Sequence, residues 1–388
     1  MFALPFAGRK EKVVAILDIG SGSVGYCLAQ VQRNAPPKIL ASERLNLPFE
    51  ERTSEQTQSA VLALLGEACE KTLEVHARMY AQKIVPVISS SYAILRAPWV
   101  RSEFAGAQVE YETDQRITGE TMDELAREAL ANETELNHQA LFEAGVVSVG
   151  LNGYATKKPI EKSAHTVSVT ALISECEPDF RTKVTESLQR SFPSAKPNLR
   201  SSTRALLSSL QESGVPPRDR VVIDVESEAT NCVVMRDGVV AENFLVPEGT
   251  RTILNRISTG MPEETLSLMR MMSRGTCNSP ACDKMNESLA RAEPELVKIF
   301  GDALGRLVSV RRLPNELVLI AEPELSQWFS VFFSRIDFCQ FTTTTRPFTP
   351  TILNSEGIRG FADTDTAGAI DAGLALAVNL VNTEEQST

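Results

Sequence analysis

The sequence predicts a two-lobed α/β protein with a small α/β subdomain inserted into its first lobe. The chain has 388 residues, more than a single hydrophobic core usually serves. An apolar strand that ends in an aspartate, followed by a tight turn and a second apolar strand, occurs once in each half of the chain. Between the two copies, residues 85–165 become rich in strand-forming residues around a short helix. We therefore expect a duplicated lobe interrupted by an insert.

The first copy of the strand-turn-strand pattern begins close to the N-terminus. Residues 13–18 form a continuous apolar run that ends at Asp18, residues 20–23 read Gly-Ser-Gly-Ser, and the chain is apolar again up to Val31. Residues 52–80 then read as a long amphipathic helix, in which Thr53 and Gln56 have the spacing of a capping box. Such a helix is expected to pack on the sheet that the two strands begin.

The second copy spans Arg220–Met235 and contains Asp224 at the corresponding place. Helical spacing precedes it at residues 177–192 and 201–212, and a helix-rich stretch at 262–312 and an apolar strand at 317–321 follow it. A Gly- and Ala-rich helix is expected at 367–380. We expect residues 1–84 and 166–215 to form the first lobe, 85–165 the inserted subdomain and 216–388 the second lobe, with a helix-rich subdomain at about 258–315.

Composition and charge exclude several classes of protein. The net charge is -11 and the pI about 5.1, which disfavours binding to a nucleic acid backbone. No apolar run is long enough to span a membrane, and the first residues lack the order of a secretory signal. Seven scattered cysteines fit a reducing compartment with free thiols, so we expect a cytoplasmic protein. Cys277 and Cys282 lack the further ligands that a zinc site needs, so they are predicted to be surface-loop thiols.

Two such turns, one in each lobe, can clamp a phosphorylated ligand between them. Backbone N–H groups of a tight turn bind phosphate oxygens, and an aspartate at the end of the strand can hold Mg²⁺ through water. An aspartate in this position can equally well only cap the backbone of the turn. We regard both roles as open for Asp18 and favour the structural role for Asp224.

Residues 18–24, with the sequence DIGSGSV, resemble the first phosphate motif of the actin, Hsp70 and sugar-kinase superfamily, in the form seen in FtsA and PilM proteins. Residues 223–224, 237–249, 317–321 and 366–375 resemble, in order, the later motifs of that superfamily, and residues 152–169 resemble the return from an SHS2-type insert. The resemblance implies a two-lobed actin/Hsp70-like fold, a duplicated ribonuclease H-like architecture with an inserted SHS2-type subdomain. It also implies a nucleotide site, if one is retained, at Asp18, Gly20, Ser21, Gly22, Ser23, Asp224, Ala229 and Thr230, with ATP as the cofactor and Mg²⁺ held at Asp18.

The second lobe departs from the family pattern at both of its nucleotide loops. The second phosphate motif, normally rich in glycine and threonine, here reads VESEAT at residues 225–230, which places Glu226 and Glu228 where phosphates would lie. At an effective dielectric constant near 20, each such repulsion is worth on the order of several kcal/mol. The adenosine loop reads AEPE at residues 321–324, which adds bulk and charge. These changes predict a degenerate nucleotide site, and no residue is assigned a catalytic role.

Three functions remain open at this stage. The first is an FtsA-like scaffold for cell division or envelope assembly, which would act through contacts with other proteins and possess no nucleotide cycle. The second is a PilM-like component of a type IV pilus platform, which would recruit a partner's N-terminal peptide, and the third is an active, filament-forming ATPase. The partners expected are proteins of the division or pilus machinery and further copies of the chain, not nucleic acid.

The two ends of the chain bear on membrane association. FtsA ends in a basic amphipathic helix, whereas residues 382–388 contain Glu384 and Glu385 and no basic residue. The apolar residues 1–6, followed by a basic cluster, are compatible with docking on a partner or lipid and with a frayed end. We expect association with the inner face of the membrane only through partners.

Overall fold

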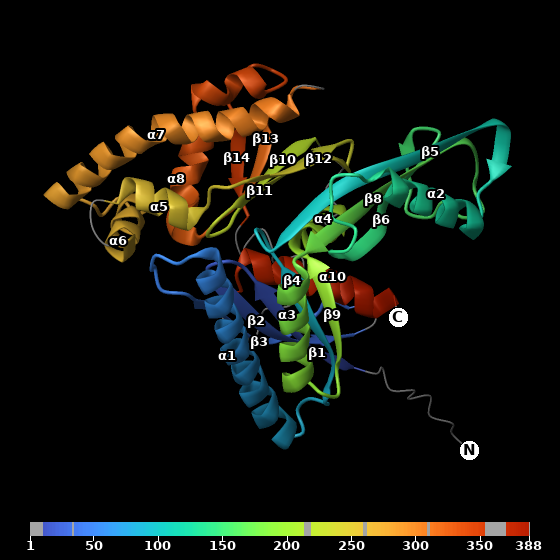
Figure 1. The fold of residues 1–388 in the computed structure, drawn as a ribbon, viewed down its shortest axis with the longest axis horizontal. Helices are drawn as coiled ribbons and strands as arrows, with labels where there is room; N and C mark the ends of the chain where they lie inside the picture. Colours follow the sequence, from blue (N-terminus) through green and yellow to red (C-terminus); the bar gives the residue numbers. More distant parts are fainter. Residues whose placement is uncertain are drawn as a thin grey trace.

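The computed structural model describes residues 11–32, 35–212, 219–258, 262–308, 311–353 and 370–387 (Figure 1). Its strands form two five-stranded sheets and one four-stranded sheet. Within these ranges no helix is both long and apolar enough to cross a membrane. The apolar residues 1–6 discussed above lie outside the described part of the chain.

The first sheet has the strand order β3-β2-β1-β4-β9. The first three strands form an antiparallel meander, and β4 and β9 continue the sheet in the direction of β1. Its elements are β1 Lys12–Ile19, β2 Ser23–Val31, β3 Lys38–Asn46, α1 Ser54–Ala81, β4 Ile88–Leu95, α3 Pro178–Ser191 and β9 Lys196–Ser201. The capping box predicted at Thr53 and Gln56 is present and begins α1. Together α1 and α3 cover one face of this sheet, where apolar side chains of both helices join those of β1 and β4 in one core.

The second sheet repeats the same order and directions as β12-β11-β10-β13-β14. Its elements are β10 Arg220–Val225, β11 Thr230–Arg236, β12 Val239–Val246, α5 Thr250–Ile257, α6 Pro262–Ser273, α7 Pro280–Leu307, β13 Glu316–Ile320, α8 Pro323–Phe333, the 3₁₀ helix η1 Ile336–Phe341 and β14 Thr349–Ile352. Its outer face is filled by aromatic side chains, among them Phe300, Phe329, Phe332, Phe333 and Phe338. The duplication expected from the two aspartate-containing units is thus present strand for strand.

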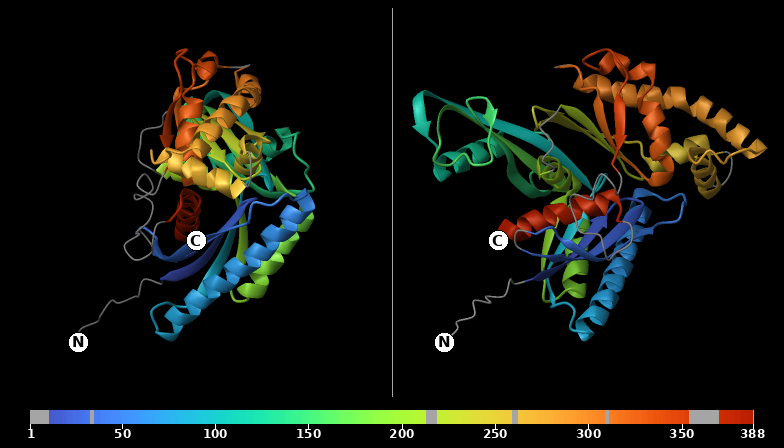
Figure 2. Two further views of the ribbon diagram at one scale, coloured as in Figure 1. Left: turned by 90° about the vertical axis from the view of Figure 1, so that its left-hand side faces the viewer. Right: turned by 180° about the vertical axis from the view of Figure 1, so that it is seen from behind.

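Two helices lie between the sheets of the two lobes: α4, Ser202–Glu212, and α10, Ala372–Ser387 (Figures 1 and 2). Their apolar side chains form one core with β1 and β2 of the first sheet and β10 and β11 of the second. In the structure, the helix predicted at 367–380 spans Ala372–Ser387. It begins later than predicted and includes the residues predicted to form a tail. The tail is ordered because Glu385 pairs with Lys12 and Glu384 with Arg200, whose Nε lies 2.6 Å from the Glu384 carboxylate.

The third sheet, β5-β8-β6-β7, projects to the side of the two lobes with α2 on one face (Figures 1 and 2). Its elements are β5 Val100–Arg116, α2 Gly119–Asn132, β6 Leu141–Leu151, β7 Tyr154–Ala155 and β8 Ser163–Cys176. The sequence placed the insert at residues 85–165, whereas β4 pairs with β1 in the first sheet and β8 extends to Cys176. We propose that the inserted subdomain follows sheet membership and spans residues 100–176.

The prediction that Cys277 and Cys282 are free thiols is wrong. Their Cα atoms are 5.8 Å apart at the turn between α6 and α7, within the range that a disulfide spans, and the two sulfur atoms are bonded. Cys27, Cys69, Cys176 and Cys232 are free and buried. No group of three or more residues suited to holding a metal ion occurs in the described ranges.

Candidate functional site

The candidate site lies where the central strands of both sheets end. Because β1 and β4 are parallel neighbours, Asp18, near the end of β1, and Arg96, directly after β4, come to the same edge of the first sheet. Asp224 lies near the end of β10, the equivalent strand of the second sheet. The packing of α4 and α10 between the lobes brings these two edges face to face.

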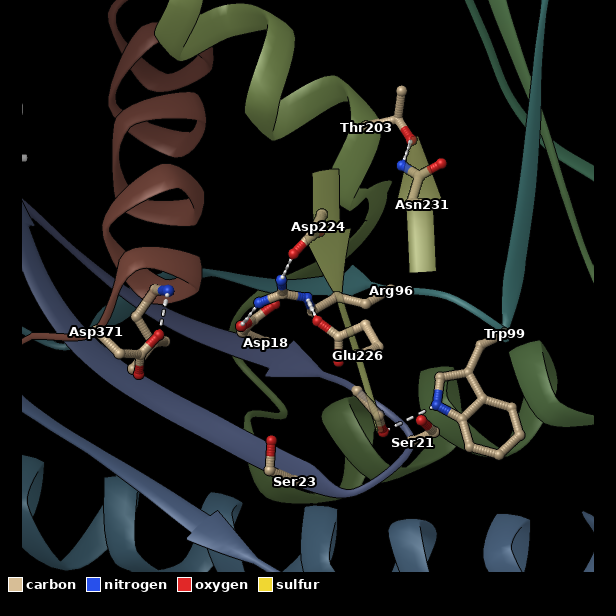
Figure 3. Close-up of polar contacts among 12 residues, drawn as sticks. Asp18, Ser21, Ser23, Arg96, Trp99, Thr203, Asp224, Glu226, Asn231 and Asp371 are labelled. Atoms are coloured by element: carbon tan, nitrogen blue, oxygen red, sulfur yellow. Dashed lines mark hydrogen bonds and ion pairs between the residues drawn. The ribbon is translucent and has the colours of Figure 1, made fainter. Parts of the chain in front are cut away.

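Arg96 joins the two lobes at this point (Figure 3). Its Nη1 donates to Asp18 Oδ2 at 3.1 Å and its Nη2 donates to Asp224 Oδ1 at 2.6 Å. Its Nε pairs with the carboxylate of Glu226, which follows β10. One buried guanidinium therefore contacts three buried carboxyl groups, one from the first lobe and two from the second. We name these four residues, Arg96, Asp18, Asp224 and Glu226, the Arg96 cluster.

A second arginine, Arg44 of β3, extends the network to the C-terminal helix. It contacts Asp18, donates from Nη1 to Ser23 Oγ at 3.0 Å, and makes two bonds to Asp371, of 3.0 and 2.9 Å. Asp371 also accepts from the backbone N–H of Leu374 and so caps the start of α10. Arg44 thus ties the first sheet to the helix that lies between the lobes.

The charges of the Arg96 cluster are strongly coupled. Burial disfavours the charge of Arg96, but Asp224, Glu226 and Asp18 outweigh it and raise the pKa of the guanidinium well above its ordinary value. Burial raises the pKa of Glu226 to about 8, against the opposing effect of Arg96. Burial also raises the pKa of Asp224. Burial and the neighbouring carboxylates thus favour the protonated form of Glu226, while the cation at the centre of the cluster is permanent.

The two turns predicted to hold phosphates pack directly against each other. A Cβ atom added to Gly20 would lie 2.6 Å from Glu226 Oε2, and one added to Gly22 would lie 2.6 Å from the Ser227 side chain. At Gly249, a Cβ would lie 2.3 Å from the carbonyl oxygen of Glu226, and at Gly373 it would lie 2.1 Å from Arg96 Nη1. These glycines allow a close approach of one protein segment to another, which a larger side chain would prevent.

The other predicted site residues complete this contact. Ser21 Oγ accepts from the backbone N–H of Glu228 at 3.1 Å, directly across the two lobes. Gly20 N–H donates to the carbonyl of Ser23 at 2.9 Å, and Glu226 N–H donates to that of Ala229 at 2.8 Å, which closes both turns. Thr230 Oγ1 donates to the carbonyl of Glu248. All eight predicted residues thus lie at or next to the junction, and they contact protein groups.

The residues present do not fit a bound ATP and Mg²⁺. The space between the two turns is filled by Glu226 and Ser227, and the carboxylate of Asp18 is engaged by Arg44 and Arg96. A cavity of about 620 Å³ remains beside the cluster, with seven acidic residues and five arginines in its wall. Those residues are Glu50, Glu226, Glu228, Glu263, Glu322, Glu324 and Asp371, and Arg44, Arg52, Arg96, Arg251 and Arg270. Each of the five arginines is already paired with an acidic side chain, so the wall offers little uncompensated positive charge to a triphosphate.

The two glutamates of the degenerate second motif have different roles. Glu226 points into the Arg96 cluster, whereas Glu228 is paired with Arg251 at 2.7 Å and lies near Thr57 of α1. In the altered adenosine loop, burial raises the pKa of Glu322 to about 7, and Glu324 pairs with Arg270 of α6. Both altered loops therefore take part in side-chain contacts of the cleft.

Sequence reasoning missed Arg96, Arg44 and Asp371. Arg96 follows directly on the apolar strand Ile88–Leu95, and a basic residue at the end of a strand parallel to β1 was the available signal. Arg44 and Asp371 carried no such signal, because β3 and α10 are far from Asp18 in sequence and meet it only through the tertiary fold.

Replacing Glu226 by glutamine tests the protonation of the cluster. Because the pKa of Glu226 is raised from 4.5 to about 8, the folded protein binds this proton more tightly than the unfolded chain does, and the resulting stability is lost as the pH rises from about 5 to 8. We expect the free energy of unfolding of Glu226→Gln, relative to the wild type, to increase over that range. Urea unfolding at a series of pH values measures it, and an identical pH dependence for both proteins would contradict the assignment.

Comparison with known proteins adds evidence on the fold. No protein-family model and no curated protein matches the sequence. Among solved structures, a chain of a PilM–PilN type IV pilus biogenesis complex matches with a TM-score of 0.61 at 14% identity, over 95% of this chain and 97% of that one. A Bacteroides thetaiotaomicron protein with an actin-like ATPase fold and unknown function covers 98% of this chain and 99% of its own at 8% identity, but its TM-score of 0.38 is too low to support an argument.

The duplicated strand order and the similarity to the PilM–PilN chain agree on architecture. Two sheets of identical order and direction, with two helices between them and the cleft at the ends of the central strands, form the two lobes of an actin-like fold. The two-lobed actin-like fold predicted from the sequence is confirmed, whereas the SHS2 type of the insert stays a prediction. This chain therefore has the actin-like fold, and the charged side chains of the Arg96 cluster lie at the position where the sequence predicted a nucleotide.

Proposed function

We propose that this chain is an actin-fold scaffold that acts through contacts with other proteins and has no nucleotide cycle. The observation that carries the proposal is the Arg96 cluster. In an actin-like ATPase a metal ion and phosphates hold the two lobes together, and these ligands bind and dissociate. Here the guanidinium of Arg96, which is part of the chain, bridges the two lobes permanently. A protein whose lobes are fixed in this way is suited to presenting a surface rather than to a cycle of opening and closing.

Of the two settings considered for such a scaffold, we favour the type IV pilus platform. The support is the structural match, over nearly the full length of both chains, to a chain from a complex of PilM with PilN. That chain was solved in a complex with a partner protein. We propose that this chain likewise binds a segment of a membrane protein of the pilus machinery. In this proposal it is cytoplasmic and reaches the inner face of the membrane with that partner.

A groove between the insert and the first lobe is suited to such a segment. It has a volume of about 670 Å³ and lies between the start of β6, α3 and β9. Among the described strands β9 pairs only with β4, so its other edge is free to accept an extended chain. Phe142 and Leu199 offer apolar surface there, and Arg181 and Glu186 are charged groups of its wall, whereas Arg200 is already paired with Glu384.

Blocking the groove tests the proposed function. The probes are synthetic N-terminal peptides of PilN-like proteins of type IV pilus machinery, with binding followed by fluorescence anisotropy. We expect Thr185→Arg, which places a long charged side chain in the groove, to weaken binding at least tenfold, about 1.4 kcal/mol. Lys183→Ala, exposed on the same helix and outside the groove, serves as the matched control. Equal binding by Thr185→Arg, or a requirement for ATP, would contradict the proposal.

An FtsA-like role in cell division is the second candidate. It is favoured by the resemblance of residues 152–169 and 237–249 to FtsA, including an SHS2-type insert. The same peptide assay separates the two settings, because a division scaffold would bind peptides of division proteins and ignore those of pilus proteins. The third hypothesis, an active filament-forming ATPase, is disfavoured by the direct packing of the two turns.

A further inference from the structure

The end of the first lobe that lies farthest from the Arg96 cluster carries an exposed apolar loop. The cluster sits at the C-terminal ends of β1 and β4, so the loop between α1 and β4 is at the opposite edge of the sheet, at the lower end of the molecule in Figure 1. Three large apolar side chains, one in the last turn of α1 and two in the loop, are more than half exposed: Tyr80 at 52%, Ile84 at 55% and Val87 at 56%. Neither the cleft nor the groove involves this loop.

Backbone hydrogen bonds hold these side chains outward. Lys83 adopts a left-handed conformation with φ 58°, its N–H donates to the carbonyl of Tyr80, and the N–H of Ile84 donates to that of Met79. This is a Schellman motif, which ends α1 and turns the chain. Pro86 is fixed by His76, whose Nε2 lies 2.9 Å from the Pro86 carbonyl oxygen. The apolar side chains are therefore presented by an ordered turn.

Exposed basic residues surround the apolar loop. Arg78 and Lys83 belong to the loop and the last turn of α1, Arg190 to the last turn of α3, and Lys196 to the start of β9, which pairs with the start of β4 at Ser90. Within the described part of the chain none of the four makes an ion pair. Glu74 and Glu186 lie one helical turn before Arg78 and Arg190, and Glu385, which hydrogen-bonds Ser90 at the start of β4, is already paired with Lys12. This end is locally cationic in a protein with a net charge of -11.

We propose that this surface, Tyr80, Ile84 and Val87 with Arg78, Lys83, Arg190 and Lys196, docks directly on an anionic phospholipid membrane. Apolar side chains that enter the boundary between headgroups and acyl chains, surrounded by Lys and Arg, are the two features that bind a protein to such a surface. Docked in this way, the first lobe stands on the membrane with the interlobe cleft facing away from it. The inference goes beyond the proposed function, in which the membrane is reached only through a partner.

Vesicle co-sedimentation of the full chain tests this proposal. We expect binding to vesicles of phosphatidylcholine with phosphatidylglycerol and none to phosphatidylcholine alone. Binding is expected to weaken as salt shortens the range of electrostatic attraction, which is about 10 Å at 0.1 M. The double variants Ile84→Ser/Val87→Ser and Lys83→Glu/Lys196→Glu are each expected to reduce the bound fraction at least fivefold.

Matched controls keep the test specific. Ile336→Ser removes an apolar side chain that is 82% exposed on the second lobe, and Lys158→Glu/Lys298→Glu makes the same change in net charge elsewhere; both should bind like the wild type. No binding to anionic vesicles, or binding that the two loop variants leave unchanged, would overturn the proposal. So would binding of this surface to an acidic protein in the absence of any affinity for lipid. Peptide binding in the groove is expected to persist in Ile84→Ser/Val87→Ser, because neither residue lines the groove, so this variant distinguishes loss of membrane docking from loss of the proposed function.

Discussion

Arg96→Ala is expected to lower the free energy of unfolding by about 3–5 kcal/mol, because removal of one partner from a buried ionic network leaves the other charges buried without compensation. Here three carboxyl groups would lose their shared counter-ion, and Asp224 and Glu226 have no other arginine within ion-pair distance among the described residues. Urea unfolding followed by tryptophan fluorescence suits the measurement, since Trp99 lies beside the site and donates to the carbonyl of Gly20.

The Arg96→Ala experiment has an internal check in its pH dependence. At low pH the orphaned carboxylates can protonate, so the loss of stability should be smaller at pH 5 than at pH 8. Arg127→Ala, at an exposed position of α2, should change stability by less than about 0.5 kcal/mol. An Arg96→Ala protein as stable as the wild type at pH 8 would show that the cluster does not hold the lobes together.

Phe333→Ala is expected to destabilise the second lobe by about 3–5 kcal/mol, the range found for buried aromatic residues replaced by alanine. Phe333 is fully buried, and its ring lies 5.2 Å from Phe300 and 5.1 Å from Phe332. This aromatic group underlies the sheet that carries Asp224 and Glu226, so its loss affects the clamp as well as the core.

The control for Phe333→Ala lies on the same helix. Val331 is 61% exposed, so Val331→Ala should change the unfolding midpoint little. Thermal unfolding of the two variants should therefore separate them clearly. Equal midpoints would mean that the aromatic cluster contributes little to the stability of the second lobe.

The fold was predictable from local patterns in the sequence. The turns at residues 20–23 and 226–229 are each encoded by a few consecutive residues, with an aspartate before the turn and an apolar strand on either side. Both turns are present in the structure as expected. The capping box at Thr53 and Gln56 marked the start of α1 in the same local way. Features that depend on a few consecutive residues can be predicted from a single sequence.

The chemistry of the site was less predictable because it depends on contacts across the fold. The sequence indicated that Glu226 and Glu228 were misplaced for a nucleotide, but not that Arg96 would neutralise one and Arg251 the other. Helix α8 was missed because Pro323 was interpreted as part of a loop, whereas it occupies the first turn of a helix, where proline is tolerated. The pairing of β4 with β1 is a long-range contact, so a single sequence gives no local signal that residues 88–95 belong to the first sheet.

The guanidinium of Arg96 between the two lobes gives the account its physical basis. A bound Mg²⁺ with phosphates can leave, and departure allows the lobes to move, but an arginine side chain is always charged and always attached. The two lobes are complementary at this point, because Glu226 of the second lobe pairs with Arg96 of the first and fills the space next to Gly20. These contacts hold the two turns against each other.

Isothermal titration calorimetry with ATP and Mg²⁺ on the wild-type protein tests this account most directly. Because the two turns are in contact and Asp18 is engaged by two arginines, we predict no heat of binding at micromolar to millimolar ATP. Micromolar affinity that is lost in Asp18→Ala would contradict it and would mean that the lobes open to admit the nucleotide.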